Sequence, residues 1–448
     1  MQQKRGQVKA KDDGAELPMN LIKEIFTHEV FPALGCTEPI ACAYAAATAA
    51  EQLPGPVERL ELIVDPGTFK NGASVTVPHS GGRKGNPVAA AIGAVIAKSA
   101  AQMEVLQEVV PETLAKACEL IEKGALEYRC REDKKGIHVE VRAEGGGSRV
   151  HCIISGGHTN VTCLEKDGKK IIGSHPREGA KSKGYRDILK DMRLEDLLRN
   201  AIQLDDGMRA YIQRGIEMNM AISEKGIDVK RTAYQLQQMK EQGILAEDLF
   251  YKVKLAVAAG VDARMAGLPQ PVMTSGGSGN QGVVAILVPY LAGLDRGIEI
   301  ARIQESIAAS HAVNSYIKCF IGELSVICGC AIGAGIASAV ALVYQQAGID
   351  MQKISFAINN VIGDLCGLIC DGAKPGCSMK TVSAAETAMR SAFMALAGYG
   401  LSPDDGLLGT LPEDSIRNLS RVTLEGMFRV DPTVIDILQD KAARRGLA

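Results

Sequence analysis

The chain has 448 residues, of which 46% are hydrophobic and 23% charged, a composition typical of a globular protein with two or three lobes. Fifty lysine and arginine residues balance 52 acidic residues, and a formal net charge of −2 excludes a strong field for nucleic acid or an anionic membrane. We therefore expect a small-molecule partner.

The N-terminus and the cysteine content indicate the compartment. Residues 1–13 are polar and charged and lack the apolar core of a signal peptide, so we expect a cytoplasmic protein. Thiols in that compartment are kept reduced. Metal binding or catalysis is then the better use for any of the twelve cysteines that cluster.

The first predicted elements are helices in an N-terminal section, residues 1–54. One helix is expected from about Pro18 to His28. In "FPALGCTEPIACAYAAATAAEQL", Pro39 follows Thr37 and Glu38 and precedes an alanine-rich run, which is typical of a helix start. Cys36 is therefore expected directly before a helix N-terminus.

Alternating or β-branched segments follow, and they predict a small α+β lobe over residues 55–175. Residues 86–124 between them are expected to form two helices. The predicted strands are 57–65, 74–78, 137–143, 149–156 and 160–167.

After a polar linker at 173–187 the pattern is helical, which predicts an all-α domain over residues 176–448. The expected fold is α+β, with a small mixed α/β lobe and a larger all-α lobe rich in glycine and alanine. An alanine-rich helical lobe without tryptophan also favours a homodimer. The predicted helices are 194–222, 229–241, 245–259, 297–313, 324–346, 352–362, 380–398 and 412–425.

One of these segments is long enough to span a membrane. Residues 324–344, "LSVICGCAIGAGIASAVALVY", carry no charge and show small-xxx-small spacing at Gly329 and Gly333, with a further small residue at Ser338. Alanine, glycine, serine and cysteine gain little from hydrocarbon, however. We therefore favour a buried helix and expect no membrane contact.

Several cysteines of the helical domain lie in glycine-rich or helix-terminal positions. Cys328 and Cys330 lie in "ICGCAIG", and Cys370 and Cys377 lie in "ICDGAKPGC". This spacing lacks the paired knuckles of structural zinc, whereas an iron–sulfur cluster tolerates looser spacing. Three thiolates would leave one iron open as a Lewis acid, and four would suit electron transfer. For Cys319, Cys330 and Cys366 the simpler interpretation as small buried apolar residues is favoured.

Five motifs in the same order resemble the L-cysteine desulfidase family, which is related to the alpha domain of iron–sulfur L-serine dehydratases. They are "PALGCTEPIA" (32–41), "GGHTN" (156–160), "SGGSGNQG" (275–282), the helix opening at Cys328, and "ICDGA...C" (369–377). The resemblance implies that Cys328, Cys370 and Cys377 ligate a 4Fe-4S cluster and that Cys36 is an active-site acid or base. Cys330 is an alternative ligand.

Two departures favour the desulfidase branch over the dehydratase branch. The loop from Cys370 to Cys377 is shorter than its dehydratase counterpart, and the C-terminal "KAARRGLA" contains no cysteine. The implied reaction is β-elimination from a small L-amino acid, L-cysteine giving pyruvate, ammonia and sulfide. The alternatives are an L-serine dehydratase, a non-catalytic iron–sulfur redox sensor, and a pyridoxal-phosphate enzyme that uses a lysine such as Lys380.

The remaining candidate residues are expected to act on the substrate beside the cluster. At a helix N-terminus Cys36 could exist partly as thiolate and take the α-proton, while Glu38 could bind an ammonium group. Gly277-x-Gly279-x-x-Gly282 lacks the βαβ context of a dinucleotide site. A turn facing a carboxylate is the better interpretation. The expected substrate-binding residues are Thr37, Ser275, Gly277, Ser278, Asn280, His158, His79 and Arg264, with Arg264 paired to Asp262 or to a substrate carboxylate.

Overall fold

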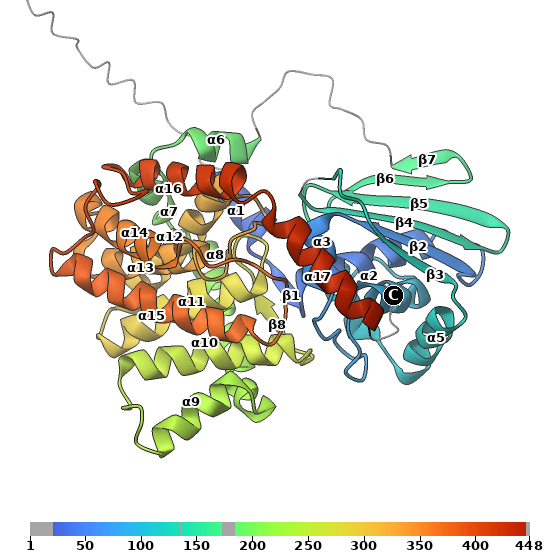
Figure 1. Cartoon of the computed structure of the whole chain (residues 1–448), viewed down its shortest axis with the longest axis horizontal. Helices are drawn as coiled ribbons and strands as arrows, with labels where there is room; N and C mark the ends of the chain where they lie inside the picture. The colour runs from blue at the N-terminus through green and yellow to red at the C-terminus, as the bar shows by residue number, and fades with distance from the viewer. Residues whose placement is uncertain (1–20, 135, 173–183, 445–448) are drawn as a thin grey trace, which may run out of the picture.

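The structure, a computed structural model, describes residues 21–134, 136–172 and 184–444, apart from the side chains of residues 442 and 443. Two lobes lie side by side in Figure 1, one built on a sheet and a larger one built of helices. Each lobe has its own hydrophobic core. The predicted α+β fold is confirmed.

A six-stranded sheet forms the small lobe, in the order β3-β2-β4-β5-β6-β7. Only β2 and β3 pair in parallel, and the other neighbours are antiparallel. In β5, Val150, Cys152 and Ile154 are buried and the residues between them are not, so one face is apolar. The strands are β2 (Arg59–Val64), β3 (Leu126–Cys130), β4 (His138–Gly145), β5 (Ser148–Ser155), β6 (Val161–Lys166) and β7 (Lys169–Ile172).

Small residues let helices pack closely on that apolar face. All 14 residues of α2 (Thr37–Ala50) are buried, because the helix lies between the sheet and α4 (Asn86–Ile96). At Gly93 of α4, a Cβ would overlap the carbonyl oxygen of Ala43 in α2. The lobe also contains α3 (Pro66–Gly72), a 3-10 helix (Gln102–Glu108) and α5 (Pro111–Glu122).

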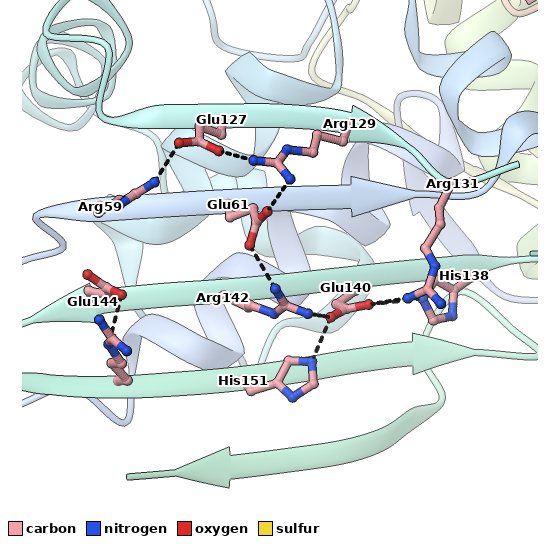
Figure 2. A network of polar contacts seen from close by, with 11 residues as sticks. Arg59, Glu61, Glu127, Arg129, Arg131, His138, Glu140, Arg142, Glu144 and His151 are labelled. Carbon is pink, nitrogen blue, oxygen red and sulfur yellow. Dashed lines mark hydrogen bonds and ion pairs between the residues drawn. The ribbon is translucent and has the colours of Figure 1, made fainter. Parts of the chain in front are cut away.

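The opposite face of the sheet carries paired charges, shown in Figure 2. Glu140 is its most enclosed member, with a side chain only 4% exposed, and it lies 2.7 Å from Arg142 and 3.0 Å from His151. Ion pairs continue across the strands to the edge of the lobe, so the charged side chains of this face are paired with one another. They are Arg142–Glu61, Arg129–Glu61, Arg129–Glu127 and Arg59–Glu127.

The helical lobe is organised around α13 (Gly333–Ala347), which is buried from Gly333 to Gln345. It packs against α11, α12, α14 and α15. The other helices are α1 (Leu21–Glu29), α6 (Tyr185–Asp191), α7 (Leu194–Ala201), α8 (Asp206–Gly226), a 3-10 turn (Ile227–Val229), α9 (Thr232–Glu241), α10 (Leu249–Met265), α11 (Gly279–Asp295), α12 (Ile300–Ile321), α14 (Met351–Leu365), α15 (Cys377–Leu396), α16 (Pro412–Arg421) and a π turn (Val422–Gly426).

Three segments tie the lobes together. Helix α1 packs on α6 and α12 of the helical lobe, although α2, which follows it, belongs to the small lobe. Helix α17 (Val430–Arg444) crosses in the other direction and packs on α3 (Figure 1). There Lys70 Nζ lies 2.6 Å from Asp431 Oδ1, and the Lys70 side chain is 1% exposed. The short strands β1 (Pro32–Leu34) and β8 (Pro271–Met273) pair between the lobes.

Most predicted strands and helices are confirmed, and the exceptions are specific. The expected strand at 74–78 is reduced to one bridge between Thr76 and Lys84, so that prediction is wrong. Strands β1, β3, β7 and β8 and helices α3, α6, α11 and α17 had not been predicted, and the single helix expected at 194–222 is divided into α7 and α8. The start of the first expected helix, residues 18–20, and most of the polar linker lie outside the described residues.

The uncharged segment 324–344 differs from its prediction in its first part. The helix begins only at Gly333, and residues 324–332 form a loop that carries Cys328 and Cys330. Among the described residues, no helix has both the length and the apolar character needed to cross a membrane.

Candidate active site

A cavity of about 70 Å³ lies where the two lobes meet, several times the volume that one water molecule needs. Both lobes contribute to its wall. The lining residues that carry polar or sulfur atoms relevant to chemistry are Cys36, Thr37, Glu38, Asn71, Arg264, Ser278, Asn280, Gln281, Lys318, Glu323, Ser325, Cys328, Cys330, Cys370, Cys377 and Lys380.

The β1–β8 pair brings two of the sequence motifs to this cavity. Leu34 of β1 lies opposite Pro271 of β8, so the chain after Leu34 runs toward the end of α10. There the carbonyl of Gly35 accepts a hydrogen bond from the guanidinium of Arg264. The "GCTEP" segment and the "SGGSGNQG" loop, distant in sequence, therefore meet at one site.

Backbone hydrogen bonds join the two cysteine-bearing loops. The N–H of Cys328 donates to the carbonyl of Leu368 at 2.8 Å, and the N–H of Cys370 donates to the carbonyl of Val326 at 2.7 Å. Cys377 is the first residue of α15. This arrangement places Cys328, Cys370 and Cys377 on the wall of the same cavity.

Neighbouring groups influence the charge of these thiols in opposite directions. A hydrogen bond with Cys330 lowers the pKa of Cys328 to about 7, and the charge of Lys380 contributes to that lowering. Burial raises the pKa of Cys377 to about 11 and also raises that of Cys370. Cys328 is therefore the thiol most readily available as thiolate.

The cysteines do not converge on a single point. Within the described ranges, no three histidine, cysteine, aspartate or glutamate side chains are grouped as ligands of one metal ion. An iron–sulfur cluster does not require its cysteines to meet at one ion, because they bind separate irons. Cys330 lines the cavity with the other three, whereas Cys319 and Cys366 do not.

Cys36 and Glu38 form a buried pair at the start of α2. The Cys36 thiol donates to Glu38 Oε2 at 2.9 Å, and Asn71 Nδ2 donates to Glu38 Oε1 at 3.0 Å. His158 Nε2 lies 3.9 Å from Glu38 Oε1, at ion-pair distance. Burial raises the pKa of the Glu38 carboxyl, but His158 and these hydrogen bonds outweigh burial and hold that pKa well below its usual range. Glu38 is therefore a carboxylate.

The protonation of Cys36 differs from the expectation of a partial thiolate. Burial, followed by the negative charge of Glu38, raises the pKa of the Cys36 thiol well above its usual value. Cys36 is the N-cap residue of α2, but its side chain makes no capping hydrogen bond, and the thiol donates to the Glu38 carboxylate instead. Cys36 thus carries its proton in this structure.

Arg264 places a buried positive charge opposite this pair. It lies in the last turn of α10, is 2% exposed, and donates to Asn280 Oδ1 and to the Gly35 carbonyl. Its Nε has no hydrogen-bond partner among the described residues, which also place no carboxylate within ion-pair distance of the guanidinium. The expected alternative pairing with Asp262 is not formed, because Asp262 instead accepts from the Ala233 N–H.

Comparison with known proteins places this chain in a family. Residues 100–436 match the family described as serine dehydratase alpha chain. The chain belongs to the serine dehydratase alpha chain family. It is 46% identical to a UPF0597 protein of Geobacter sulfurreducens, over 94% of this chain and 99% of that one. A UPF0597 protein of Elusimicrobium minutum is 42% identical over 94% of this chain and 100% of its own length.

Family membership confirms the relation to serine dehydratase alpha chains that the motifs predict, and the desulfidase branch stays a prediction. Nine of the predicted site residues line the cavity. Three come from the start of α2, two from the start of α11 and one from α10, and the other three are the predicted cluster cysteines. The nine residues are Cys36, Thr37, Glu38, Ser278, Asn280, Arg264, Cys328, Cys370 and Cys377.

Four other predicted residues lie elsewhere. His158 and Gly277 do not line the cavity themselves. Gly277 lies near the His158 ring, and His158 lies near Glu38. Ser275 is fully buried, and its hydroxyl lies 2.9 Å from His311 Nδ1. His79 is exposed on its own loop and does not line the cavity.

Several cavity residues of this family member had not been singled out from the sequence. Lys318 and Gln281 lie within helices, and Asn71 lies in the short helix α3. An isolated lysine or amide in a helix carries no sequence signal of function. Lys318 shares α12 with other polar residues such as Arg302, Glu305 and His311, so the sequence around it does not indicate its place in the cavity.

Proposed function

We propose that this protein is an iron–sulfur lyase that eliminates the β-substituent of a small L-amino acid, with L-cysteine as substrate. The products are pyruvate, ammonia and sulfide. Family membership supports lyase chemistry. The observation that carries the proposal is that Cys328, Cys370 and Cys377 line the same cavity as Cys36 and Glu38.

The donor set fits a 4Fe-4S cluster held by Cys328, Cys370 and Cys377. Thiolates are the soft ligands that such clusters use. Two lysines, Lys380 and Lys70, exert positive charge on Cys328 and Cys370 and thereby favour their thiolate forms. A cluster with three protein ligands supplies an open iron, a Lewis acid for the leaving group.

The other residues bind and orient the amino acid. Arg264 offers an unpaired guanidinium nitrogen to the α-carboxylate. Ser278 and Asn280, at the N-terminal end of α11, add the positive end of a helix dipole. Glu38, an ionised carboxylate inside the cavity wall, is the complementary partner for the α-ammonium group.

Substrate binding would also change the proton affinity of Cys36. The carboxylate of Glu38 is one of the causes that raise the Cys36 pKa. An ammonium group beside Glu38 would offset that negative charge, which favours release of the proton from Cys36 Sγ. The resulting thiolate would take the proton from Cα, so the acid or base role of Cys36 depends on a bound zwitterion.

L-Serine is the second candidate substrate, because the matching family is described as serine dehydratase alpha chain. The same residues would bind the same carboxylate and ammonium, with hydroxide in place of sulfide as the leaving group. Soft sulfur suits iron better than hydroxyl oxygen does, which favours L-cysteine.

Anaerobic purification followed by iron and sulfide analysis tests the cofactor. We expect about four irons per chain. The kcat/KM values for L-cysteine and L-serine on the cluster-loaded protein then rank the two substrates, with sulfide and pyruvate measured as products. An intact cluster with no turnover of either amino acid would refute the lyase and favour a redox sensor.

A further inference from the structure

Lys318 is a buried lysine that the proposed function has not used. It lies in α12, is 6% exposed, and lines the cavity. Its Nζ donates to the carbonyl oxygen of Gly276, and no carboxylate of the described residues lies within ion-pair distance of it. An ammonium group has three donor hydrogens, so two remain for another acceptor.

A buried ammonium without a carboxylate in direct contact is costly, and burial lowers the pKa of Lys318, although the more distant carboxylates of Glu323, Glu29 and Glu38 act in the opposite direction. An anionic ligand in direct contact would give the two remaining donor hydrogens of Lys318 an acceptor. The cavity that Lys318 lines is open to a ligand of a few heavy atoms. A small anion therefore fits the position.

Lys318 and Arg264 reach the cavity past the same glycine-rich loop. A Cβ at Gly276 would lie 2.5 Å from Lys318 Cδ, and a Cβ at Gly279 would overlap the Arg264 guanidinium. Gly276 also has a φ of +54°, which favours glycine. The loop thus leaves room for two cations, one of which, Arg264, has a buried nitrogen without a partner.

We infer that Lys318 acts with Arg264 as a two-cation site for the α-carboxylate of the substrate, so that a free carboxylate is required. The inference rests on the proposed lyase function and narrows its substrate class to amino acid zwitterions. Glu38 lines the same cavity, and among Lys318, Arg264 and Glu38 it alone carries a negative charge. Its buried carboxylate would pair with the ammonium group of the substrate.

The first test compares Lys318→Met with Lys254→Met. Lys254 is also largely buried, at 14% side-chain exposure, but it pairs with Glu386 at 2.9 Å and does not line the cavity. We expect Lys318→Met to raise the KM for L-cysteine about 10- to 100-fold, the loss of one charge-assisted contact. Lys254→Met should leave KM unchanged.

L-Cysteine methyl ester separates substrate binding from a purely structural role. Wild-type protein should prefer L-cysteine to the ester, and Lys318→Met should remove most of that preference, because the lost contact was made to the carboxylate. If Lys318 only ties α12 to the Gly276 carbonyl, both substrates would suffer equally. An unchanged preference would therefore overturn the inference.

L-Alanine provides a measurement that does not depend on turnover, because it has both charges but no leaving group. Calorimetry on cluster-loaded protein should show L-alanine binding to wild type and Lys254→Met, and binding at least about 10-fold weaker to Lys318→Met. Equal binding to all three, or none to wild type, would overturn the inference. Lys318-dependent binding without turnover of any β-substituted amino acid would support the carboxylate site and refute the lyase.

Discussion

The ion pair between Lys70 and Asp431 fastens α17 to the small lobe and predicts a large effect from a conservative substitution. Asp431→Asn keeps the size of the side chain but removes its charge. The Lys70 side chain is 1% exposed, so its ammonium group would stay buried without a partner. Breaking a buried pair costs about 3–5 kcal/mol, and we expect about 3 kcal/mol because Asp431 is 18% exposed.

Chemical denaturation of the cluster-free and cluster-loaded protein measures this free energy of unfolding. Glu119→Gln is the control, because Glu119 and Lys123 form a pair with side chains 59% and 67% exposed, whose loss should change the free energy of unfolding very little. The double variant Lys70→Met with Asp431→Leu should recover stability to within about 1 kcal/mol of wild type, since no charge is left buried.

Hydrogen exchange localises the effect. Asp431→Asn should accelerate exchange in α17 and α3 and leave α5 unchanged. Because Asn71 follows Lys70 and donates to Glu38, we also expect a higher KM. If Asp431→Asn is as stable as Glu119→Gln, or if α17 exchanges no faster, the pair does not fasten the helix.

Three further predictions concern the site. Glu38→Gln should lower kcat/KM for L-cysteine about 10- to 100-fold, because the ammonium group loses its charged partner, with cluster content unchanged. Gly279→Ala should displace the Arg264 guanidinium, raise KM and destabilise the protein by about 1–3 kcal/mol, whereas Gly207→Ala, where a Cβ meets only one atom at 3.4 Å, should do neither. Burial lowers the pKa of His311 to about 3, so the unfolded state binds the extra proton between there and about pH 6.5. Stability should fall by about 2 kcal/mol between pH 7 and 5 through His311, and the acid-induced loss should be correspondingly smaller in His311→Gln. Equal losses in the two proteins would exclude His311 as the source.

The sequence predicts an element correctly where the residues close to it in the chain determine its structure. Pro39 and the alanine run predict the start of α2 at Thr37, and the structure agrees. Helix α11 was missed because it opens on glycines and contains Pro289, both poor helix formers. Tertiary packing overrides that preference, since α11 is buried against α10, α12 and α13.

The loop at residues 324–332 illustrates a non-local choice. Its apolar sequence predicts a helix, yet Val326 and Cys328 bond to the backbone of Cys370 and Leu368. The loop around Ile369, distant in sequence, provides hydrogen bonds that a helix would otherwise supply, through an isolated bridge to Ile327. For the same reason Lys318, whose role depends on a loop forty residues earlier, could not be singled out from the sequence.

The protonation of Cys36 shows why position on a helix was a poor guide to chemistry. A helix N-terminus stabilises an anion by about 0.3–1 kcal/mol, less than one pKa unit. Full burial shifts a pKa by up to about 3–5 units, and the adjacent Glu38 carboxylate acts in the same direction. Burial and the neighbouring charge therefore decide the outcome. In the proposed reaction, base activity of Cys36 therefore requires a change that offsets these two causes, and the substrate ammonium beside Glu38 is the group that would offset the second.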